Sequence, residues 1–151
     1  MTGDTGFLAG LTPGHRGQLL ALSRNASFPA DRRMFEEGED AVTFWIVGRG
    51  SVALDIHVSG RPAPVVETLG PGDLLGWSWL FPPYQWHLGA RTLSPVDVHA
   101  FEVAEVRSYC ESDPAFGYDL ARAVAAVIGE RLRATRIRLL DLYGPPPGGG
   151  R

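Results

Sequence analysis

The chain has 151 residues, of which 44% are apolar and 21% charged, a composition typical of one soluble globular domain. Its net charge of −3 argues against a nucleic-acid-binding protein that relies on a positive field over its whole surface. No segment approaches the ~20 apolar residues of a membrane-spanning helix, and the N-terminus lacks the features of a signal peptide.

The first predicted element is a helix that begins at Thr12 and Pro13 and runs to about Arg24. Thr is a good N-cap, and Pro fits the first helical position. Short segments rich in β-formers follow, and the 19 glycines and 12 prolines suit a body of strands and turns. Val52, Leu54 and Ile56 alternate with less apolar neighbours, which predicts a half-buried strand. The expected strands cover residues 33–35, 43–47, 51–58, 64–69, 88–93 and 96–101.

A long helix over residues 113–143 is the last predicted element, and Gly144 with the following prolines ends it. One stripe of this helix, Leu120, Val124 and Val127, is expected to face the strands. A second stripe has alternating spacings of four and three residues, the heptad pattern by which two helices pair. The alternative is that both stripes form one wide face buried within a single chain. The predicted homodimer interface comprises Ile128, Leu132, Thr135, Leu139 and Leu142.

Several motifs in this order resemble the effector domain of the catabolite activator protein family, also found in cyclic-nucleotide-gated channels and kinase regulatory subunits. Residues 34–39 resemble the family's strand–turn element, in which Gly38 takes a positive φ. Gly70, Gly72 and Gly76 belong to a segment that resembles the approach to its phosphate-binding cassette.

This resemblance implies a single domain over residues 7–143 that is mainly β with α. The expected architecture is an eight-stranded antiparallel β-roll of the double-stranded jelly-roll type. It covers about residues 26–102, with an N-terminal helix before it and a long C-terminal dimerisation helix, residues 113–143, after it. Residues 144–151 are expected to form a flexible tail.

The cassette itself departs from the family. In the family it opens with a Gly-Glu pair whose carboxylate binds the ribose, and a later arginine binds the cyclic phosphate, as a buried anion requires. Here Trp77 follows Gly76 in place of the glutamate. Strand register places Trp86 in the arginine position, and direct counting places His87 there. Loss of that counter-charge costs on the order of 3–5 kcal/mol for a buried phosphate, so a cyclic nucleotide (cAMP or cGMP) is only one candidate ligand.

An aromatic cluster replaces the lost residues, and three interpretations of it remain open. It forms a pocket for a flat or apolar ligand, an exposed contact for a protein partner, or a filled hydrophobic core without a ligand. The ligand-binding candidates are Leu75, Gly76, Trp77, Ser78, Trp86, His87 and Thr135, the last because it aligns with a threonine of the family's long helix that reaches the nucleotide base. The partner-binding candidates are Trp79, Phe81 and Tyr84.

Other classes of site have little support in the sequence. No arrangement of Ser, Cys, His and Asp points to a nucleophile, so we expect no catalytic residues and no enzymatic activity. The four histidines lack metal-ligand spacing, and we expect no metal site. Because Cys110 is the single cysteine, an internal disulfide is excluded, and we expect a cytoplasmic protein. Five arginines of the last helix are interpreted as a solvated face, with a phosphate-binding strip as the alternative: Arg122, Arg131, Arg133, Arg136 and Arg138.

The sequence thus predicts a non-enzymatic sensor or regulatory module that binds a small ligand and signals through a protein partner. One alternative is a ligand-free accessory subunit that uses the aromatic cassette as its contact surface. A second is a DNA-associated transcriptional regulator. The chain ends where a helix-turn-helix would begin in the family's transcription factors, so we expect no DNA contact, and we expect no membrane partner.

Overall fold

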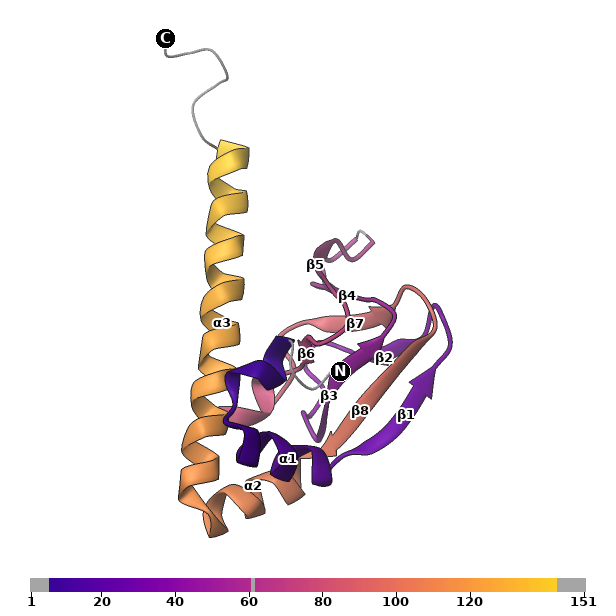
Figure 1. The fold of residues 1–151 in the computed structure, drawn as a ribbon. Coiled ribbons are helices and arrows are strands. Elements are labelled where there is room, and N and C mark those ends of the chain that lie inside the picture. The colour runs from indigo at the N-terminus through magenta and orange to yellow at the C-terminus, as the bar shows by residue number, and fades with distance from the viewer. Residues whose placement is uncertain (1–5, 61, 144–151) are drawn as a thin grey trace.

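Two four-stranded antiparallel sheets form the body of the molecule, and three helices lie at one end and along one side (Figure 1). The computed structural model describes residues 6–60 and 62–143. A short 3-10 helix, Gly6–Gly10, and α1, Pro13–Ala21, precede the strands. Helices α2, Val103–Ser112, and α3, Pro114–Tyr143, follow them.

One sheet has the order β1-β8-β3-β6 and the other the order β2-β7-β4-β5, which confirms the predicted eight-stranded antiparallel β-roll. The strands of the first sheet are β1 (Arg24–Phe28), β8 (Val96–Glu102), β3 (Thr43–Arg49) and β6 (Leu74–Leu75). The strands of the second are β2 (Arg33–Phe35), β7 (Gly89–Thr92), β4 (Val52–Asp55) and β5 (Val65–Leu69).

Strands β1 and β6 and helix α2 were not predicted from the sequence. β1 has only partly buried or exposed residues and joins the sheet by pairing with β8, so it carries no hydrophobic alternation. β6 is two residues long. α2 begins at Val103, directly after β8 ends at Glu102, with no glycine or proline to mark the change. The first helix ends at Ala21, three residues before the predicted Arg24, because β1 begins there.

The prediction of a half-buried strand over residues 51–58 was wrong in its burial and its end. All four residues of β4 are buried, and Ile56, beyond its end, is 38% exposed. Asp55 is tolerated in the interior because Arg33 of β2 binds both of its carboxylate oxygens, at 2.6 and 2.7 Å. β4 is therefore covered on both faces.

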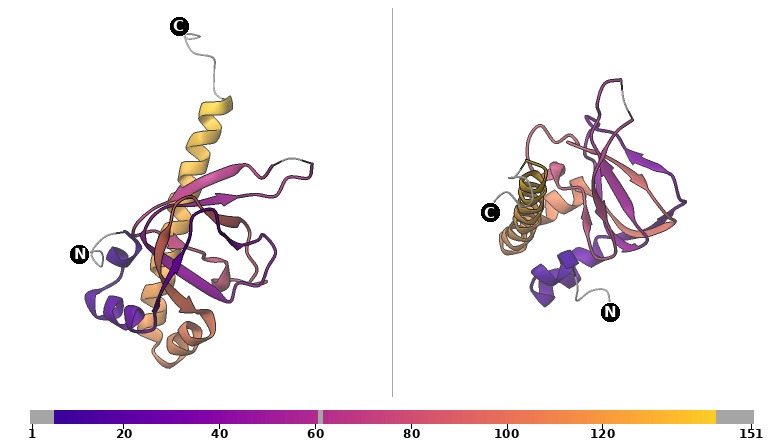
Figure 2. Two further views of the ribbon diagram at one scale, coloured as in Figure 1. Left: turned by 90° about the vertical axis from the view of Figure 1, so that its right-hand side faces the viewer. Right: turned by 90° about the horizontal axis from the view of Figure 1, so that it is seen from above.

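α3 begins as predicted, with the Phe116 amide donating to the Asp113 side chain at 3.2 Å. Leu120 and Val124 are 1% and 0% exposed, which confirms that this stripe faces the body. The views along and across α3 show the helix standing beside the β-roll and continuing beyond α1 and α2 (Figure 2).

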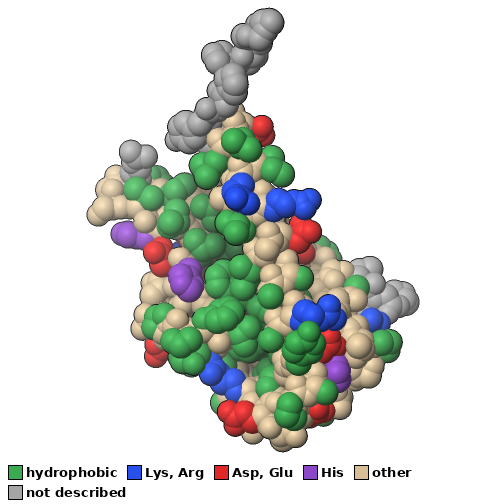
Figure 3. Space-filling view, turned by 90° about the vertical axis from the view of Figure 1, so that its left-hand side faces the viewer, with side chains coloured by type: hydrophobic (Ala, Val, Ile, Leu, Met, Phe, Trp, Pro, Cys, Tyr) green, Lys and Arg blue, Asp and Glu red, His purple; other side chains and the backbone are tan. Residues whose placement is uncertain are grey.

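The far half of α3 carries apolar side chains that residues 6–60 and 62–143 leave exposed. In the space-filling view of its outer side, hydrophobic side chains gather along the helix up to its end (Figure 3). The exposed fractions are 57% for Leu132, 54% for Ile137, 49% for Leu139 and 70% for Leu140. Leu132 and Leu139 of the heptad seam are therefore not buried against the described residues, and pairing through the seam remains a prediction. The side chain of Leu142 and residues 144–151 lie outside the described residues.

A buried carboxylate joins the N-terminal helix to α3. Asp119 is 5% exposed and accepts hydrogen bonds from the Thr12 amide at 3.0 Å and from Arg122 at 3.2 Å. The Nδ1 atom of His15 lies 2.8 Å from the same carboxylate. The hydrogen bond from the Thr12 amide has the largest effect on the pKa of Asp119 and the contact with His15 the next largest. Together they hold this pKa below its ordinary value of 3.8. These bonds fix α1 against the first turns of α3.

We expect Asp119→Asn to lower the free energy of unfolding by about 1–3 kcal/mol at pH 7, because a charged acceptor of several hydrogen bonds is lost. Because the pKa of Asp119 is lower in the folded protein than its ordinary value of 3.8, the ionised carboxylate stabilises the fold above pH 3.8. This stabilisation is lost as the pH falls towards the folded-state pKa of Asp119. The difference between the two proteins in urea unfolding should therefore shrink below pH 3.8. Asp141→Asn, at an exposed position of α3, is the control. If Asp119→Asn lowers the free energy of unfolding equally at pH 7 and below pH 3.8, the stabilising role of the Asp119 charge is contradicted.

No helix within residues 6–60 and 62–143 is both long enough and apolar enough to cross a membrane.

Candidate functional site

A pocket of about 350 Å³ lies between the β-roll and α3, at the segment predicted to be the cassette. Its volume is near the lower end of the range for small-molecule sites. Strands β2, β4 and β5 and the segments after β6 and before β7 form one wall, and α3 forms the other. The lining residues are Phe35, Leu54, Val66, Glu67, Gly76, Trp77, Ser78, Trp86, His87, Leu88, Ile128, Arg131, Leu132 and Thr135.

The pocket brings together residues that are far apart in the sequence. Six of the seven predicted ligand-binding residues line it: Gly76, Trp77, Ser78, Trp86, His87 and Thr135. Three residues of the predicted dimer interface, Ile128, Leu132 and Thr135, line it as well, whereas Leu139 does not. Binding of a ligand by these residues remains a prediction.

Leu75 and Trp79 do not occupy their predicted places. Leu75 is 0% exposed and pairs with Trp45 in the first sheet, so it belongs to the core rather than to the pocket wall. Trp79 is 1% exposed, stacks on Phe44 at 4.4 Å between ring centroids and donates its indole N–H to the Gly76 carbonyl. Its assignment to a partner-binding surface was wrong, because this ring completes the hydrophobic core.

Trp86, which strand register predicts to stand at the family's arginine position, belongs to the hydrophobic core. Its ring is 5% exposed, stacks on Phe35 at 4.4 Å and lies near Trp45 at 6.3 Å. Gly76 adopts φ +100°, and a Cβ atom there would lie 2.6 Å from the Trp86 ring, so only glycine allows this approach. The filled-core interpretation therefore holds for Trp79 and Trp86, while an open pocket remains beside them.

Trp77 and His87 form the outer rim of the pocket. Their rings stack at 5.5 Å with an interplanar angle of 24°. The Nδ1 atom of His87 lies 2.8 Å from the hydroxyl of Ser78, which is 4% exposed. This contact holds the exposed imidazole in place and gives the pocket a flat aromatic side.

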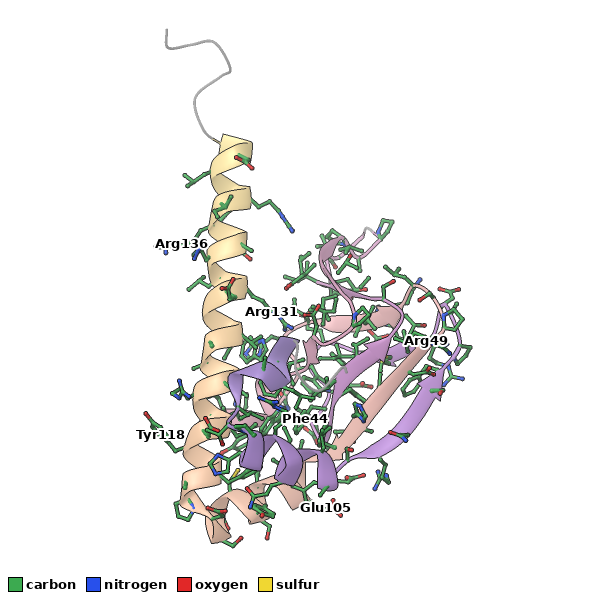
Figure 4. All side chains as sticks on the ribbon, viewed as in Figure 1. Phe44, Arg49, Glu105, Tyr118, Arg131 and Arg136 are labelled. Atoms are coloured by element: carbon green, nitrogen blue, oxygen red, sulfur yellow. The ribbon has the colours of Figure 1, made fainter. Side chains whose placement is uncertain are left out.

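Arg131 is one of the five arginines of α3 that were predicted to form a solvated face. It points from α3 towards the β-roll, whereas Tyr118 and Arg136 point away from it (Figure 4). Its side chain is 16% exposed, and its Nε atom lies 3.5 Å from Glu67 of β5. The same guanidinium donates to the Leu74 carbonyl. Burial lowers the pKa of Arg131, although the carboxylates of Glu67 and Asp73 oppose that effect.

The sequence contained one signal for this placement. Arg131 lies between Ile128 and Thr135 at helical spacing, so the three residues share one side of α3. Arg138, seven residues further along, also reaches the body and donates to the Val66 carbonyl. Arg122 is bound to Asp119, so three of the five arginines are engaged within the molecule.

Phe81 and Tyr84 are exposed, as the partner-binding prediction requires. Their exposed fractions are 46% and 39%. Tyr84 adopts φ +60°, and the Arg107 guanidinium lies 4.0 Å from the centroid of its ring. Arg107 also donates to the Trp79 carbonyl, which ties this turn to α2.

No cluster of three or more His, Cys, Asp or Glu side chains with the geometry of a metal site occurs among residues 6–60 and 62–143. Burial raises the pKa of the Cys110 thiol, which is the opposite of what a nucleophilic thiolate needs.

The comparisons with known proteins agree with this architecture. Residues 25–113 match the family model of the cyclic nucleotide-binding domain. The CRP-like cAMP-activated global transcriptional regulator of Mycobacterium tuberculosis is 28% identical over 142 residues. That alignment covers 91% of this chain and 59% of the regulator, so the chain spans well under two thirds of its curated relative.

Two solved structures show the same fold. A candidate cyclic nucleotide-binding protein from Geobacter metallireducens is 31% identical with a TM-score of 0.72, covering 83% of this chain and 91% of that one. The catabolite activator protein of Thermus thermophilus is 22% identical with a TM-score of 0.74, covering 91% and 63%.

Proposed function

Because the chain belongs to the cyclic nucleotide-binding domain family, we propose that it is a non-enzymatic sensor that binds a small molecule between its β-roll and α3. It then passes the signal to other proteins. The observation that carries this proposal is the pocket of about 350 Å³, whose walls come from both parts of the molecule.

The position of the pocket explains how binding would be transmitted. A ligand there contacts Ile128, Leu132 and Thr135, which are also predicted to pair α3 with a second copy. Occupancy then changes the surface that pairs, and a ligand shifts the equilibrium between states in proportion to its preference for one of them. We therefore propose a homodimer whose helix pairing responds to the ligand.

Thermal unfolding against a panel of compounds tests the proposal. The panel contains cyclic mono- and dinucleotides, nucleosides, nucleotides, haem and lipidic compounds. A ligand at 100 times its dissociation constant adds about 2.7 kcal/mol of stability, which is readily measured. No stabilisation by any compound would count against a small-molecule role.

A variant that fills the pocket separates specific from nonspecific stabilisation. Thr135→Trp places a large ring at the pocket wall and should abolish the stabilisation by any compound that acts there. Arg136→Trp is the matched control, because Arg136 points away from the body (Figure 4) and does not line the pocket. Equal responses of both variants would place the binding elsewhere.

A ligand-free accessory role is the second candidate, favoured by the exposed Phe81 and Tyr84. Phe81→Ser with Tyr84→Ser should abolish co-purification with a partner while leaving thermal unfolding unchanged. Leu93→Ser, at a position 52% exposed in another part of the surface, is the control. Retention of the partner by the double variant would exclude this surface.

The DNA-associated role has less support, because Arg122, Arg131 and Arg138 are bound within the molecule. Salt-sensitive binding of duplex DNA would reverse this order of preference. A cytoplasmic location remains our expectation.

A further inference from the structure

The charged end of the pocket is an ion pair between its two walls. Arg131 of α3 and Glu67 of β5 both line the pocket, with 3.5 Å between Arg131 Nε and Glu67 Oε2. Their side chains are 16% and 32% exposed. The pocket therefore offers those N–H groups of Arg131 that Glu67 and the Leu74 carbonyl do not use, beside the Glu67 acceptor, with no net charge from the pair.

Among residues 6–60 and 62–143 no other arginine or lysine lines the pocket, and Trp86, which strand register predicts to stand in place of the family's phosphate-binding arginine, lines it instead. An anion entering here would meet Arg131 and Glu67 at similar distances, so attraction and repulsion largely cancel. Asp73 adds a second negative charge that acts on Arg131. The cost of removing an anion from water would then remain uncompensated.

The rest of the pocket is flat and apolar. Trp77 stacks with His87 at the rim, Trp86 lies against Gly76, and Leu54 and Leu132 belong to the opposing walls. Such surfaces favour a planar ring, and a polar edge of that ring would lie at the ion pair.

We propose that the pocket selects an uncharged, planar heteroaromatic ligand whose ring edge carries a hydrogen-bond acceptor beside a donor. The acceptor binds the Arg131 guanidinium, and the donor binds the Glu67 carboxylate. Purine nucleobases and nucleosides have such an edge, and a nucleotide adds a phosphate that this pocket does not neutralise. This inference rests on the proposed function, because it assigns the ligand class of the same pocket.

Matched pairs of ligands that differ by the phosphate test the inference. Guanosine is compared with cyclic GMP, and adenosine with cyclic AMP, by calorimetry and tryptophan fluorescence on the full chain at pH 8. In at least one pair we expect the nucleoside to bind about tenfold or more tightly than its cyclic nucleotide, because the phosphate charge faces Glu67.

Glu67→Gln removes that negative charge and keeps the size of the side chain. It should weaken nucleoside binding, strengthen cyclic-nucleotide binding and so reduce the ratio within each pair by about tenfold. Glu130→Gln is the control. This substitution also removes one negative charge, but Glu130 lies on α3 and does not line this pocket. Thermal unfolding of both variants confirms that they are folded.

Each other outcome has a distinct meaning. If a cyclic nucleotide binds the wild-type protein as tightly as its nucleoside does, and Thr135→Trp abolishes that binding, this inference is overturned. The proposed function then still stands. Failure of both nucleosides to bind, while another panel compound binds in the pocket, overturns the ligand class alone. Failure of every compound overturns the proposed function as well.

Discussion

We expect Trp86→Arg, which places an arginine where strand register predicts the family's arginine, to lower the free energy of unfolding by about 3–5 kcal/mol without creating cyclic-nucleotide binding. Trp86 is 5% exposed and stacks on Phe35 at 4.4 Å. An arginine there would lose the stack and leave its charge in an apolar environment. The position is therefore part of the core in this chain.

Urea unfolding and calorimetry with cyclic AMP check both parts of this expectation. Trp86→Phe is the control, because it keeps an aromatic ring and removes only part of the buried surface, for a loss of about 1–2 kcal/mol. Wild-type stability of Trp86→Arg together with new cyclic AMP binding would show that the cassette still has its ancestral geometry.

Asp55→Ala is expected to lower the free energy of unfolding by about 2–4 kcal/mol. Asp55 is 6% exposed and binds both terminal nitrogens of Arg33, at 2.6 and 2.7 Å. Gly89 permits the pair, since a Cβ there would lie 2.1 Å from Arg33 and 2.7 Å from Asp55. Without Asp55, a guanidinium in a side chain only 26% exposed would keep just its contact with Glu36.

An exposed ion pair provides the control for this experiment. Arg24 and Glu102 lie 2.8 Å apart with side chains 62% and 41% exposed, so Arg24→Ala should leave the free energy of unfolding nearly unchanged. Adding Arg33→Met to Asp55→Ala should recover part of the lost stability, because the unpaired charge is then removed. Equal losses in urea unfolding for Asp55→Ala and Arg24→Ala would contradict a special role for the buried pair.

The residues of the candidate site were only partly predictable from the sequence. Gly76, Trp77, His87 and Thr135 were identified by their positions in the family's order, and the structure places them around one pocket. Trp79 was misassigned because composition cannot tell an exposed aromatic ring from a buried one. Its place in the core depends on Phe44, which lies 35 positions earlier in the chain.

The sequence by itself determined the features that depend on neighbouring residues. Turn residues, the Thr12 cap and helical spacing are local patterns, and they indicated six of the eight strands, the start of the first helix and the start of the long helix at Asp113 and Pro114. The apolar stripe of α3 that faces the body was also evident from spacing alone.

Only the tertiary structure decided which polar groups meet. Arg131 and Glu67 are 64 positions apart, and their contact depends on how α3 lies against β5. The pairing of Arg33 with Asp55 and the approach of Trp86 to Gly76 likewise depend on the placement of separate strands and loops. Side-chain contacts between distant segments fix the charge and shape of the pocket. The order of motifs along the sequence therefore predicted where the pocket lies, and only the tertiary contacts determine which polar and apolar groups line it.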